Sequence, residues 1–312
     1  MTAPTALRIG IRPPHACFES EPTRLREYLA VTEDAGIDHL CVGDHVSFRG
    51  GRGYDGLVQA TALAVLSPLP VHTSVYLLTL RHPVPVARQV ASLAQLAPGR
   101  FVFGVGLGGD DPHELAVCGV DPRTRGRRLD ESLAVVRGLL HGETVALDGE
   151  VFRVPEARFE PAPRLPVPIV VGGRSDAALR RAARFGDGWL GLFVTPDRWT
   201  TARNLVVALA TETGRPDVPT QHGLVAWCGF GRDALDARAR LAAEMEALYQ
   251  LPYERFARYA PAGTPDDVAA ALAPYVDAGC TRLNLIPVAE DDRTAIAGVA
   301  RVRALLGEGV RV

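Results

Sequence analysis

Residues 83–106 read PVPVARQVASLAQLAPGRFVFGVG, and this stretch decides the class of fold. Apolar residues recur at helical spacing from Pro83 to Ala97, which predicts an amphipathic helix over that range. Pro98 and Gly99 then end the helix, and the apolar run Arg100–Val105 has the length of a buried strand. A helix that leads directly into a buried strand is one repeat of an α/β fold.

The same alternation extends over the whole chain. Eight apolar runs predict strands, and a helical segment follows each of them. The predicted strands are Leu7–Ile11, Ile37–Val42, Val71–Leu77, Arg100–Val105, Val167–Val171, Gly188–Leu192, His222–Cys228 and Thr281–Ile286. These runs are too apolar for a sheet with one solvated face, so they favour a (β/α)8 TIM barrel over an open, doubly wound sheet. No linker or composition shift divides the 312 residues, and we expect a single domain over 1–312.

Helix ends are marked by glycines and by one capping residue. Gly36 follows a predicted helix over Thr23–Ala35, and Gly279 closes the helix that starts after Thr264. These signals place the helices between the predicted strands, as a barrel requires.

Two segments are longer than ordinary loops, and long ordered insertions are often functional. Leu107–Asp121 follows the fourth predicted strand, and Gly142–Pro166 precedes the fifth. In the second segment, Val145–Phe152 predicts a hairpin around Asp148-Gly149. After the first, we expect the next helix to begin near Arg123.

Composition excludes several classes of function. The 34 basic and 36 acidic side chains give a net charge of −2, which leaves no basic surplus for a nucleic-acid partner. The sequence contains no lysine, so Schiff-base enzymes and P-loop nucleotidases are excluded. The five cysteines are scattered without a C-x-x-C pair, which favours a reduced cytoplasm and no zinc site. Without a signal peptide or an apolar run of membrane length, we expect a cytoplasmic protein with no membrane partner.

A carboxylate and an imidazole follow the second predicted strand, at the end where a barrel holds its active site. Asp44 and His45 together suit proton transfer near neutral pH, and we predict that both are catalytic. The alternative is a purely structural pair.

The fifth predicted strand ends in a glycine pair that opens a helix. Gly172 and Gly173 allow close backbone approach, and Ser175 starts the helix whose N–H groups attract an anion. Arg174 adds a planar donor suited to phosphate. The pattern predicts an anion site, and the alternative is a tight strand-to-helix turn.

Gly104, Gly106 and Gly109 satisfy the G-x-G-x-x-G pattern, yet no helix start follows them as a dinucleotide fold requires. We therefore interpret these glycines as room for a flat ring system. The motifs G-x-S-x-G, H-E-x-x-H and H-x-H are absent, so a metal-dependent barrel hydrolase is the least favoured class and no metal site is expected.

In this order, the motifs resemble the bacterial luciferase-like flavin- and deazaflavin-dependent oxidoreductases. The segments that carry the resemblance are Gly36–Leu40 with Gly43–His45, Leu80–Pro83 with Ala87–Leu93, Gly99–Phe101 with Gly104–Gly106, Arg125–Glu131, Pro168–Gly173 and Ala183–Trp189. They cover nearly the whole chain.

The resemblance implies a (β/α)8 barrel and assigns roles to residues. Ser74 and Val75 would form a bulge, often with a cis non-prolyl peptide, that supports the ring of the cofactor. The resemblance and the glycine pattern together place Gly106 and Gly108 beside that ring. Gly172, Gly173, Arg174 and Ser175 would hold the cofactor phosphate. His45 would act as a base or orienting group, with Asp44 beside it.

The resemblance leaves the cofactor and the reaction open. Coenzyme F420 is favoured over FMN because the arginine-rich, lysine-free chain resembles actinobacterial members. We expect hydride transfer to or from a small organic substrate. The alternatives are an FMN-dependent monooxygenase that uses O2 and a flavin reductase partner, or a non-catalytic flavin-binding barrel. Family members are often dimers, which implies a homodimer. In the sugar-phosphate dehydrogenases of the family an acid directly follows the glycine turn, where this chain has Gly109 and then Asp110.

Overall fold

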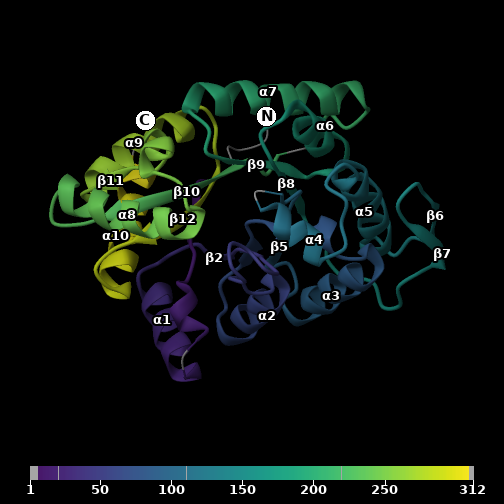
Figure 1. The fold of residues 1–312 in the computed structure, drawn as a ribbon, viewed down its shortest axis with the longest axis horizontal. Coiled ribbons are helices and arrows are strands. Elements are labelled where there is room, and N and C mark those ends of the chain that lie inside the picture. Colours follow the sequence, from purple (N-terminus) through teal and green to yellow (C-terminus); the bar gives the residue numbers. More distant parts are fainter. Residues whose placement is uncertain (1–5, 20, 110, 219, 309–312) are drawn as a thin grey trace. The chain divides into compact units, whose positions relative to one another are not determined.

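The computed structural model describes residues 6–19, 21–109, 111–218 and 220–308 (Figure 1). Its strands are β1 Arg8–Ile11, β2 His39–Val42, β3 Val71–Thr73, β4 Tyr76–Leu77, β5 Phe101–Gly106, β6 Val145–Asp148, β7 Arg153–Ala157, β8 Ile169–Gly172, β9 Gly188–Leu192, β10 Gly223–Phe230, β11 Ala262–Gly263 and β12 Arg282–Val288. Its α-helices are α1 Pro22–Asp34, α2 Gly56–Leu66, α3 Pro83–Leu96, α4 Pro112–Val117, α5 Arg125–Leu140, α6 Asp176–Phe185, α7 Pro196–Glu212, α8 Ala234–Tyr249, α9 Pro265–Asp277 and α10 Asp292–Glu308. Short 3-10 helices occur at η1 His15–Cys17, η2 Leu78–Leu80, η3 Tyr253–Arg255 and η4 Ala257–Tyr259.

The main sheet is a ring of parallel strands. Its order is β10-β12-β1-β2-β3-β5-β8-β9, and a further pairing of β9 with β10 closes it. Each predicted strand is present in this ring, and helices follow the strands along the chain. The fold is therefore the (β/α)8 barrel that the alternating pattern predicted. The short strands β4 and β11 pair with β5 and β10.

The third predicted strand, Val71–Leu77, is divided in two. The Ser74–Val75 peptide bond is cis, β3 ends before it and β4 begins after it. This interruption is the bulge that the family resemblance implied.

Helix ends lie where the sequence signals placed them. Gly36 and Gly279 follow α1 and α9 with φ of +72° and +92°, the left-handed region that glycine tolerates. At the start of α9, Thr264 Oγ1 accepts from Asp267 N at 3.3 Å, and the Asp267 carboxylate accepts from Thr264 N at 2.9 Å. This reciprocal capping box fixes the first turn of α9.

Both long insertions carry structure of their own. The hairpin β6–β7 is present, but its turn spans residues 149–152, closed by a 2.9 Å bond from Gly149 N to Phe152 O, and its second arm runs on to Ala157. The segment after β5 contains α4, capped by Asp111, which the sequence analysis missed; α5 then begins at Arg125. Helix α4 is only six residues long, too short for a periodic pattern to show.

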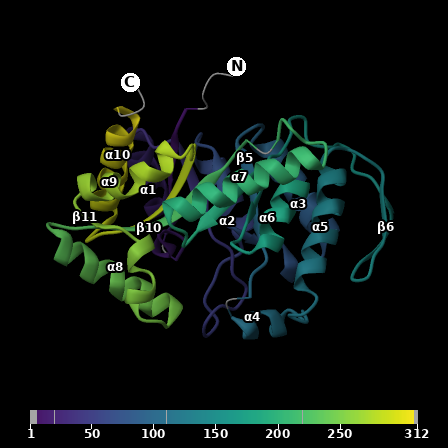
Figure 2. The ribbon, with the colours of Figure 1, turned by 90° about the horizontal axis from the view of Figure 1, so that it is seen from above.

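Internal contacts divide the chain into two units. The first unit takes residues 1–41, 190–205 and 221–312, and in it α9 packs beside α10 (Figure 2). One core cluster of this unit contains Trp227, Leu241, Met245, Tyr253, Phe256 and Ala260. The second unit takes residues 42–189 and 206–220, and in it α3 packs beside α5 (Figure 1). The expectation of a single domain stays a prediction.

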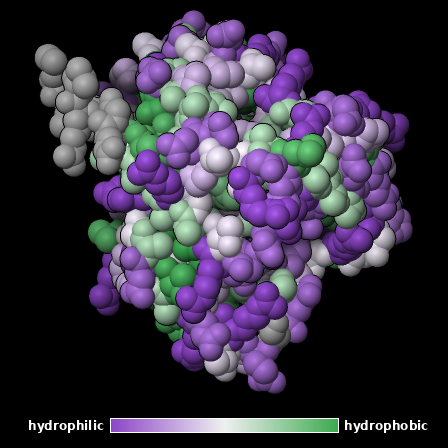
Figure 3. Space-filling model, turned by 90° about the vertical axis from the view of Figure 1, so that its left-hand side faces the viewer, coloured by the Kyte–Doolittle hydropathy of each residue, from purple (hydrophilic) through white to green (hydrophobic). Residues whose placement is uncertain are grey.

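Charged and polar side chains dominate the face seen in Figure 3, and hydrophobic residues form only small patches there. All three tryptophans, Trp189, Trp199 and Trp227, are buried and serve the core. In the part of the chain that the structure describes, no helix is both long enough and apolar enough to span a membrane.

Candidate active site

The predicted site residues all belong to the second unit. They follow strands β2, β3, β5 and β8, whose carboxyl ends point the same way because the strands are parallel. Within this unit, Ser74 N donates to Val42 O at 2.7 Å, which ties the segment after β3 to the end of β2.

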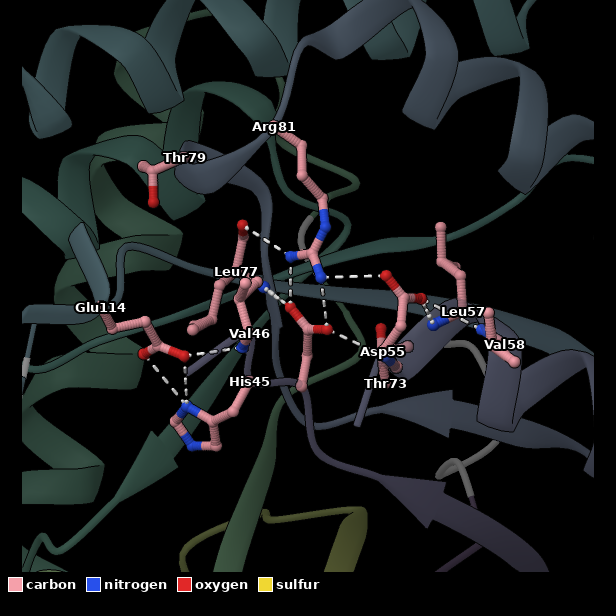
Figure 4. Close-up of polar contacts among 12 residues, drawn as sticks. His45, Val46, Asp55, Leu57, Val58, Thr73, Leu77, Thr79, Arg81 and Glu114 are labelled. Atoms are coloured by element: carbon pink, nitrogen blue, oxygen red, sulfur yellow. Dashed lines mark hydrogen bonds and ion pairs between the residues drawn. The ribbon is translucent and has the colours of Figure 1, made fainter. Parts of the chain in front are cut away.

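His45 is paired with a carboxylate that lies 69 residues further along the chain. Its Nδ1 is 3.2 Å from each carboxylate oxygen of Glu114, which α4 supplies (Figure 4). The imidazole is partly open, with 31% of its side chain exposed, whereas the Glu114 side chain is only 3% exposed. The dyad therefore combines a buried carboxylate with an imidazole that solvent reaches.

The short helix α4 also holds the loop that carries His45. Glu114 Oε1 accepts from Val46 N at 2.7 Å and from Ser47 N at 3.2 Å. Asp111 accepts from Arg49 N at 2.7 Å. Two carboxylates from α4 thus bind the backbone of the β2–α2 loop, and Figure 2 shows this loop beside α4.

Electrostatics favour an ionised Glu114. Burial acts to raise the pKa of Glu114, but the hydrogen bond and charge of His45 and the backbone N–H groups of Val46 and Ser47 lower it, and the net pKa is lowered. An ionised carboxylate can only accept hydrogen bonds, so the hydrogen in the His45–Glu114 contact belongs to Nδ1.

The hydrogen-bond partners of Asp44 are different from those of His45. Its carboxylate accepts from Arg81 at 2.7 and 2.9 Å, from Gly56 N at 2.8 Å and from Leu77 N at 2.8 Å. Figure 4 shows Arg81, the residue after η2, reaching toward Asp55, which it also contacts at 2.9 Å. Burial acts to lower the pKa of Arg81, but the neighbouring carboxylates outweigh it and the pKa is raised. The sequence placed Asp44 beside His45 as its partner, and the contacts give that place to Glu114.

Val75 packs between two of the predicted glycines. A Cβ on Gly106 would lie 2.3 Å from Val75 Cγ2, and a Cβ on Gly172 would lie 3.0 Å from Val75 Cγ1. These two glycines therefore leave space for the Val75 side chain. The Val75 side chain is itself half-buried.

The loop after β5 continues this glycine-rich surface. Leu107 O accepts from Thr79 Oγ1 at 2.6 Å, and Gly108 follows with φ of +68°. Gly109 lies under Arg125, whose Nη1 would be 1.9 Å from a Cβ there. Asp110, the acid noted in the sequence, lies outside the described residues.

The loop after β8 leads into a helix N-terminus. Gly173 has φ of +129°, and its carbonyl accepts from Trp189 Nε1 at 2.8 Å. Ser175 caps α6 by accepting from Ala178 N at 3.3 Å, and Arg174 is exposed beside it. The positive end of the α6 dipole and the glycine backbone suit an anion.

These features fit a flat ring that carries a phosphate. Val75 packs against Gly106, Gly172 and a small apolar cluster, and its half-buried side chain offers an apolar support that a ring can rest against. A Cβ at Gly106 or Gly172 would displace that support. Three residues after Gly172, α6 begins and offers its N–H groups to an anion.

The sequence analysis missed Glu114, Asp111 and Arg81. Asp111-Pro112 is a capping signal followed by a proline at the first helical position, which marks the start of α4. Arg81 lies in one of the motifs that carried the family resemblance. Among the described residues, no group of three His, Cys, Asp or Glu side chains is placed to hold a metal ion.

Two relatives and one solved structure illustrate which known proteins this chain is similar to. An F420-dependent glucose-6-phosphate dehydrogenase of Beutenbergia cavernae is 31% identical over 306 residues, 89% of this chain and 90% of that protein. A Mycobacterium tuberculosis protein described as uncharacterized is 38% identical over 190 residues, and this alignment spans 60% of this chain and 65% of that protein. An F420-dependent secondary alcohol dehydrogenase, solved with an F420–acetone adduct, has a TM-score of 0.83 at 18% identity and covers 96% of this chain and 99% of that one.

The solved structure shows the fold, since its identity is low, and the sequence matches show the family. A family model described as luciferase-like monooxygenase matches residues 5–282. Together with a relative aligned along nearly its whole length, this match confirms the resemblance carried by the motifs. The chain belongs to the luciferase-like monooxygenase family.

Proposed function

We propose that the protein is an F420-dependent oxidoreductase that moves a hydride between the deazaflavin and the hydroxyl or carbonyl carbon of a small organic substrate. The observation that carries this proposal is the His45–Glu114 dyad, a partly exposed imidazole held by a buried carboxylate. A reaction between an alcohol and a carbonyl moves a proton as well as a hydride, and an imidazole suits that task near neutral pH.

The names of the relatives support F420 over FMN. The enzyme of Beutenbergia cavernae and the secondary alcohol dehydrogenase are both described as F420-dependent. When bound, a deazaflavin supplies a carbon that accepts or returns a hydride. In this chain Val75 would support the ring, with Gly106 and Gly108 beside it. Ser74 would hold the segment that carries Val75.

The phosphate of the cofactor would be held where β8 meets α6. Gly172 and Gly173 bring backbone close to it, and the N-terminus of α6 at Ser175 attracts its charge. The exposed Arg174 would add a guanidinium suited to phosphate oxygens. Trp189 holds the Gly173 carbonyl and so fixes the loop.

Within the reaction, His45 would handle the proton. In the oxidation of an alcohol, His45 Nε2 would take the hydroxyl proton while the carbon that bears this hydroxyl gives its hydride to the bound deazaflavin, which leaves the carbonyl product. In the reverse direction Nε2 returns the proton to the oxygen. Asp44, with its bonds to Leu77 and Gly56, would keep the end of β2 in place beside the segment after β3. We therefore propose Asp44 as a positioning residue.

The first test is equilibrium titration of the apo-protein with F420 and with FMN in one buffer, followed by fluorescence. Tight F420 binding with weak FMN binding is the expected result. Tight binding of FMN alone would instead favour a monooxygenase that works with reduced flavin, O2 and a separate reductase, as the description of the family model suggests. If neither F420 nor FMN binds, Val75 and the N-terminus of α6 do not form a cofactor site.

His45→Gln is the matching test of chemistry. We expect this variant to keep its affinity for F420 and to lose about 10²- to 10⁴-fold in turnover, the usual contribution of a positioned proton-transfer group. The measurement is deazaflavin reduction with a panel of small alcohols. His113→Gln, on an exposed residue of α4, is the control and keeps wild-type turnover. Full activity of His45→Gln would remove His45 from the reaction, and F420 binding without turnover in the wild type would favour a carrier protein.

A further inference from the structure

We infer that Glu114 is the positioning residue of His45 and keeps the proton of the neutral imidazole on Nδ1, so that Nε2 is the atom that exchanges the substrate proton. The inference rests on the proposed function, which gives proton transfer to His45. It adds the residue that determines which ring nitrogen of His45 exchanges the proton, and that residue lies in the insertion after β5.

Both oxygens of Glu114 lie 3.2 Å from His45 Nδ1, but only Oε1 also accepts from the backbone. Oε1 accepts from Val46 N at 2.7 Å and from Ser47 N at 3.2 Å, so the backbone fixes its position. Oε2 is 3.2 Å from His45 Nδ1, and among the described residues His45 is its only hydrogen-bond partner. An ionised carboxylate has no hydrogen to donate, so a neutral imidazole facing it must carry its hydrogen on Nδ1.

Packing prevents the ring from turning over. The His45 ring stacks on Phe48 with centroids 4.2 Å apart and an angle of 26° between the planes. Phe48 is buried, and its backbone N–H and C=O pair with Arg52 at 2.8 Å in a small hairpin. The stack and the Glu114 contact together leave Nε2 on the far side of the ring from the carboxylate (Figure 4). Nε2 has no protein partner within the described ranges, and it belongs to a side chain that is 31% exposed, so a substrate can approach the ring.

This geometry predicts the effect of one isosteric change. In Glu114→Gln the amide oxygen stays with the two backbone N–H groups, because only an oxygen can accept from them. The amide NH2 then takes the place of Oε2 and donates to His45 Nδ1. An amide NH2 that faces Nδ1 favours the tautomer with its hydrogen on Nε2, which can then no longer accept a proton from a substrate.

The direct test reads the tautomer in the apo-protein. ¹⁵N-histidine-labelled protein is studied by long-range ¹H–¹⁵N NMR at about pH 8.5, two pH units above the ordinary pKa of a histidine side chain. The His45 signals are assigned by their loss in His45→Gln. We expect the Nδ1–H form in wild type and the Nε2–H form in Glu114→Gln. The same tautomer in both proteins would overturn the inference.

Two further variants separate positioning from general damage to the loop. Asp111→Asn weakens the other α4 contact to the loop, at Arg49 N, and should leave the His45 tautomer unchanged. His113→Gln should match wild type in tautomer and in turnover. If Asp111→Asn also moves the hydrogen to Nε2, the loop as a whole and not Glu114 sets the tautomer, and the inference fails.

Kinetics provide the second readout. With F420 bound, Glu114→Gln should lower kcat about 10²-fold or more while the affinity for F420 stays within about twofold of wild type. Equal kcat in the two proteins would overturn the role of Glu114 in the reaction. Because the NMR measurement needs neither cofactor nor substrate, a change of tautomer in a protein without turnover would count against the proposed function and leave the control of His45 by Glu114 supported.

Discussion

The guanidinium of Arg81 neutralises a carboxylate that has no access to water. The Asp44 side chain is 0% exposed and the Arg81 side chain 18% exposed, and the two form a bidentate pair at 2.7 and 2.9 Å. Arg81 also stacks its guanidinium over the Tyr76 ring at 4.3 Å. A buried charge that loses its partner costs far more than the pair contributes.

Arg81→Met should therefore destabilise the protein by about 3–5 kcal/mol, because it leaves the Asp44 carboxylate buried without a cation. Urea unfolding followed by circular dichroism measures the change. The double variant Asp44→Asn with Arg81→Met should lose less than the sum of the two single variants, since the neutral amide removes the buried charge that Arg81 pairs with, although its single oxygen keeps only one of the bonds from Gly56 N and Leu77 N. Additive losses would show that Asp44 and Arg81 do not depend on each other.

The order of residues along the chain misled the assignment of the His45 partner. Asp44 and His45 are neighbours in the loop that follows β2, yet the structure gives them different partners. Asp44 bonds to Arg81, and His45 bonds to Glu114. A histidine at a strand end can be predicted from sequence, but a partner 69 residues away on a six-residue helix cannot.

The turn of the hairpin β6–β7 is bound to α5 by Glu131, beside an ion pair from Arg127 to Glu150. Glu131 accepts from the backbone N–H groups of Glu150, Val151 and Phe152, at 2.9, 3.2 and 2.8 Å. Its carboxylate thus satisfies three N–H groups of one turn.

Removing that carboxylate should loosen the turn without unfolding the barrel. In Glu131→Ala, we expect faster amide exchange at Val151 and Phe152 and faster proteolysis within residues 149–152, with a loss of about 1–3 kcal/mol in stability. Hydrogen exchange followed by mass spectrometry measures the first effect. Glu156→Ala, on an exposed residue of β7, is the control. Unchanged exchange in Glu131→Ala would show that the turn is held without the Glu131 carboxylate.

Elements with strong local signals were predictable, and those fixed by distant contacts were not. The glycine after α1 and the threonine before α9 marked helix ends because they act through local backbone geometry. The turn of β6–β7 was placed too early, at Asp148-Gly149, because Glu131 binds the turn one residue further on. Such a contact leaves no mark in the local pattern.

The barrel as a whole contains a buried histidine that makes its stability depend on pH. His39 is 2% exposed, and its Nε2 lies 2.6 Å from Asn284 Oδ1, which joins β2 to β12 in the first unit. Burial lowers the pKa of His39 from 6.5 to about 4, although the Asn284 contact acts to raise it. The unfolded chain therefore takes up a proton at a higher pH than the folded protein does.

Stability should be fully present above about pH 6.5 and should fall as the pH drops toward 4, by about 3 kcal/mol from this residue. Urea unfolding at intervals between pH 7.5 and about pH 4.5 measures the slope. His39→Gln keeps a donor for Asn284 and removes the titrating group, so its slope over this range should be flatter. Equal slopes in the two proteins would show that His39 does not carry the acid sensitivity.

The architecture followed from the chain because eight apolar runs, each too apolar for a one-sided sheet, leave few folds that bury them all. The first and last strands of the barrel, β1 and β12, pair in parallel. Arg8 lies opposite Arg282, and Ile11 lies opposite Leu285. The pattern of apolar runs could not predict which side chains meet at the ends of the strands, because the loops after the strands determine those contacts.

The contacts between α4 and the β2–α2 loop have a consequence for protein engineering and for the evolution of the family. Residues 45–53 and 111–117 form one exchangeable part, because Glu114 and Asp111 serve backbone N–H groups of the other segment. A chimera that imports only one segment from a relative separates the histidine from its carboxylate, whereas a chimera that imports both keeps them matched. New specificities in this lineage are therefore best sought by recombining the two segments as a cassette.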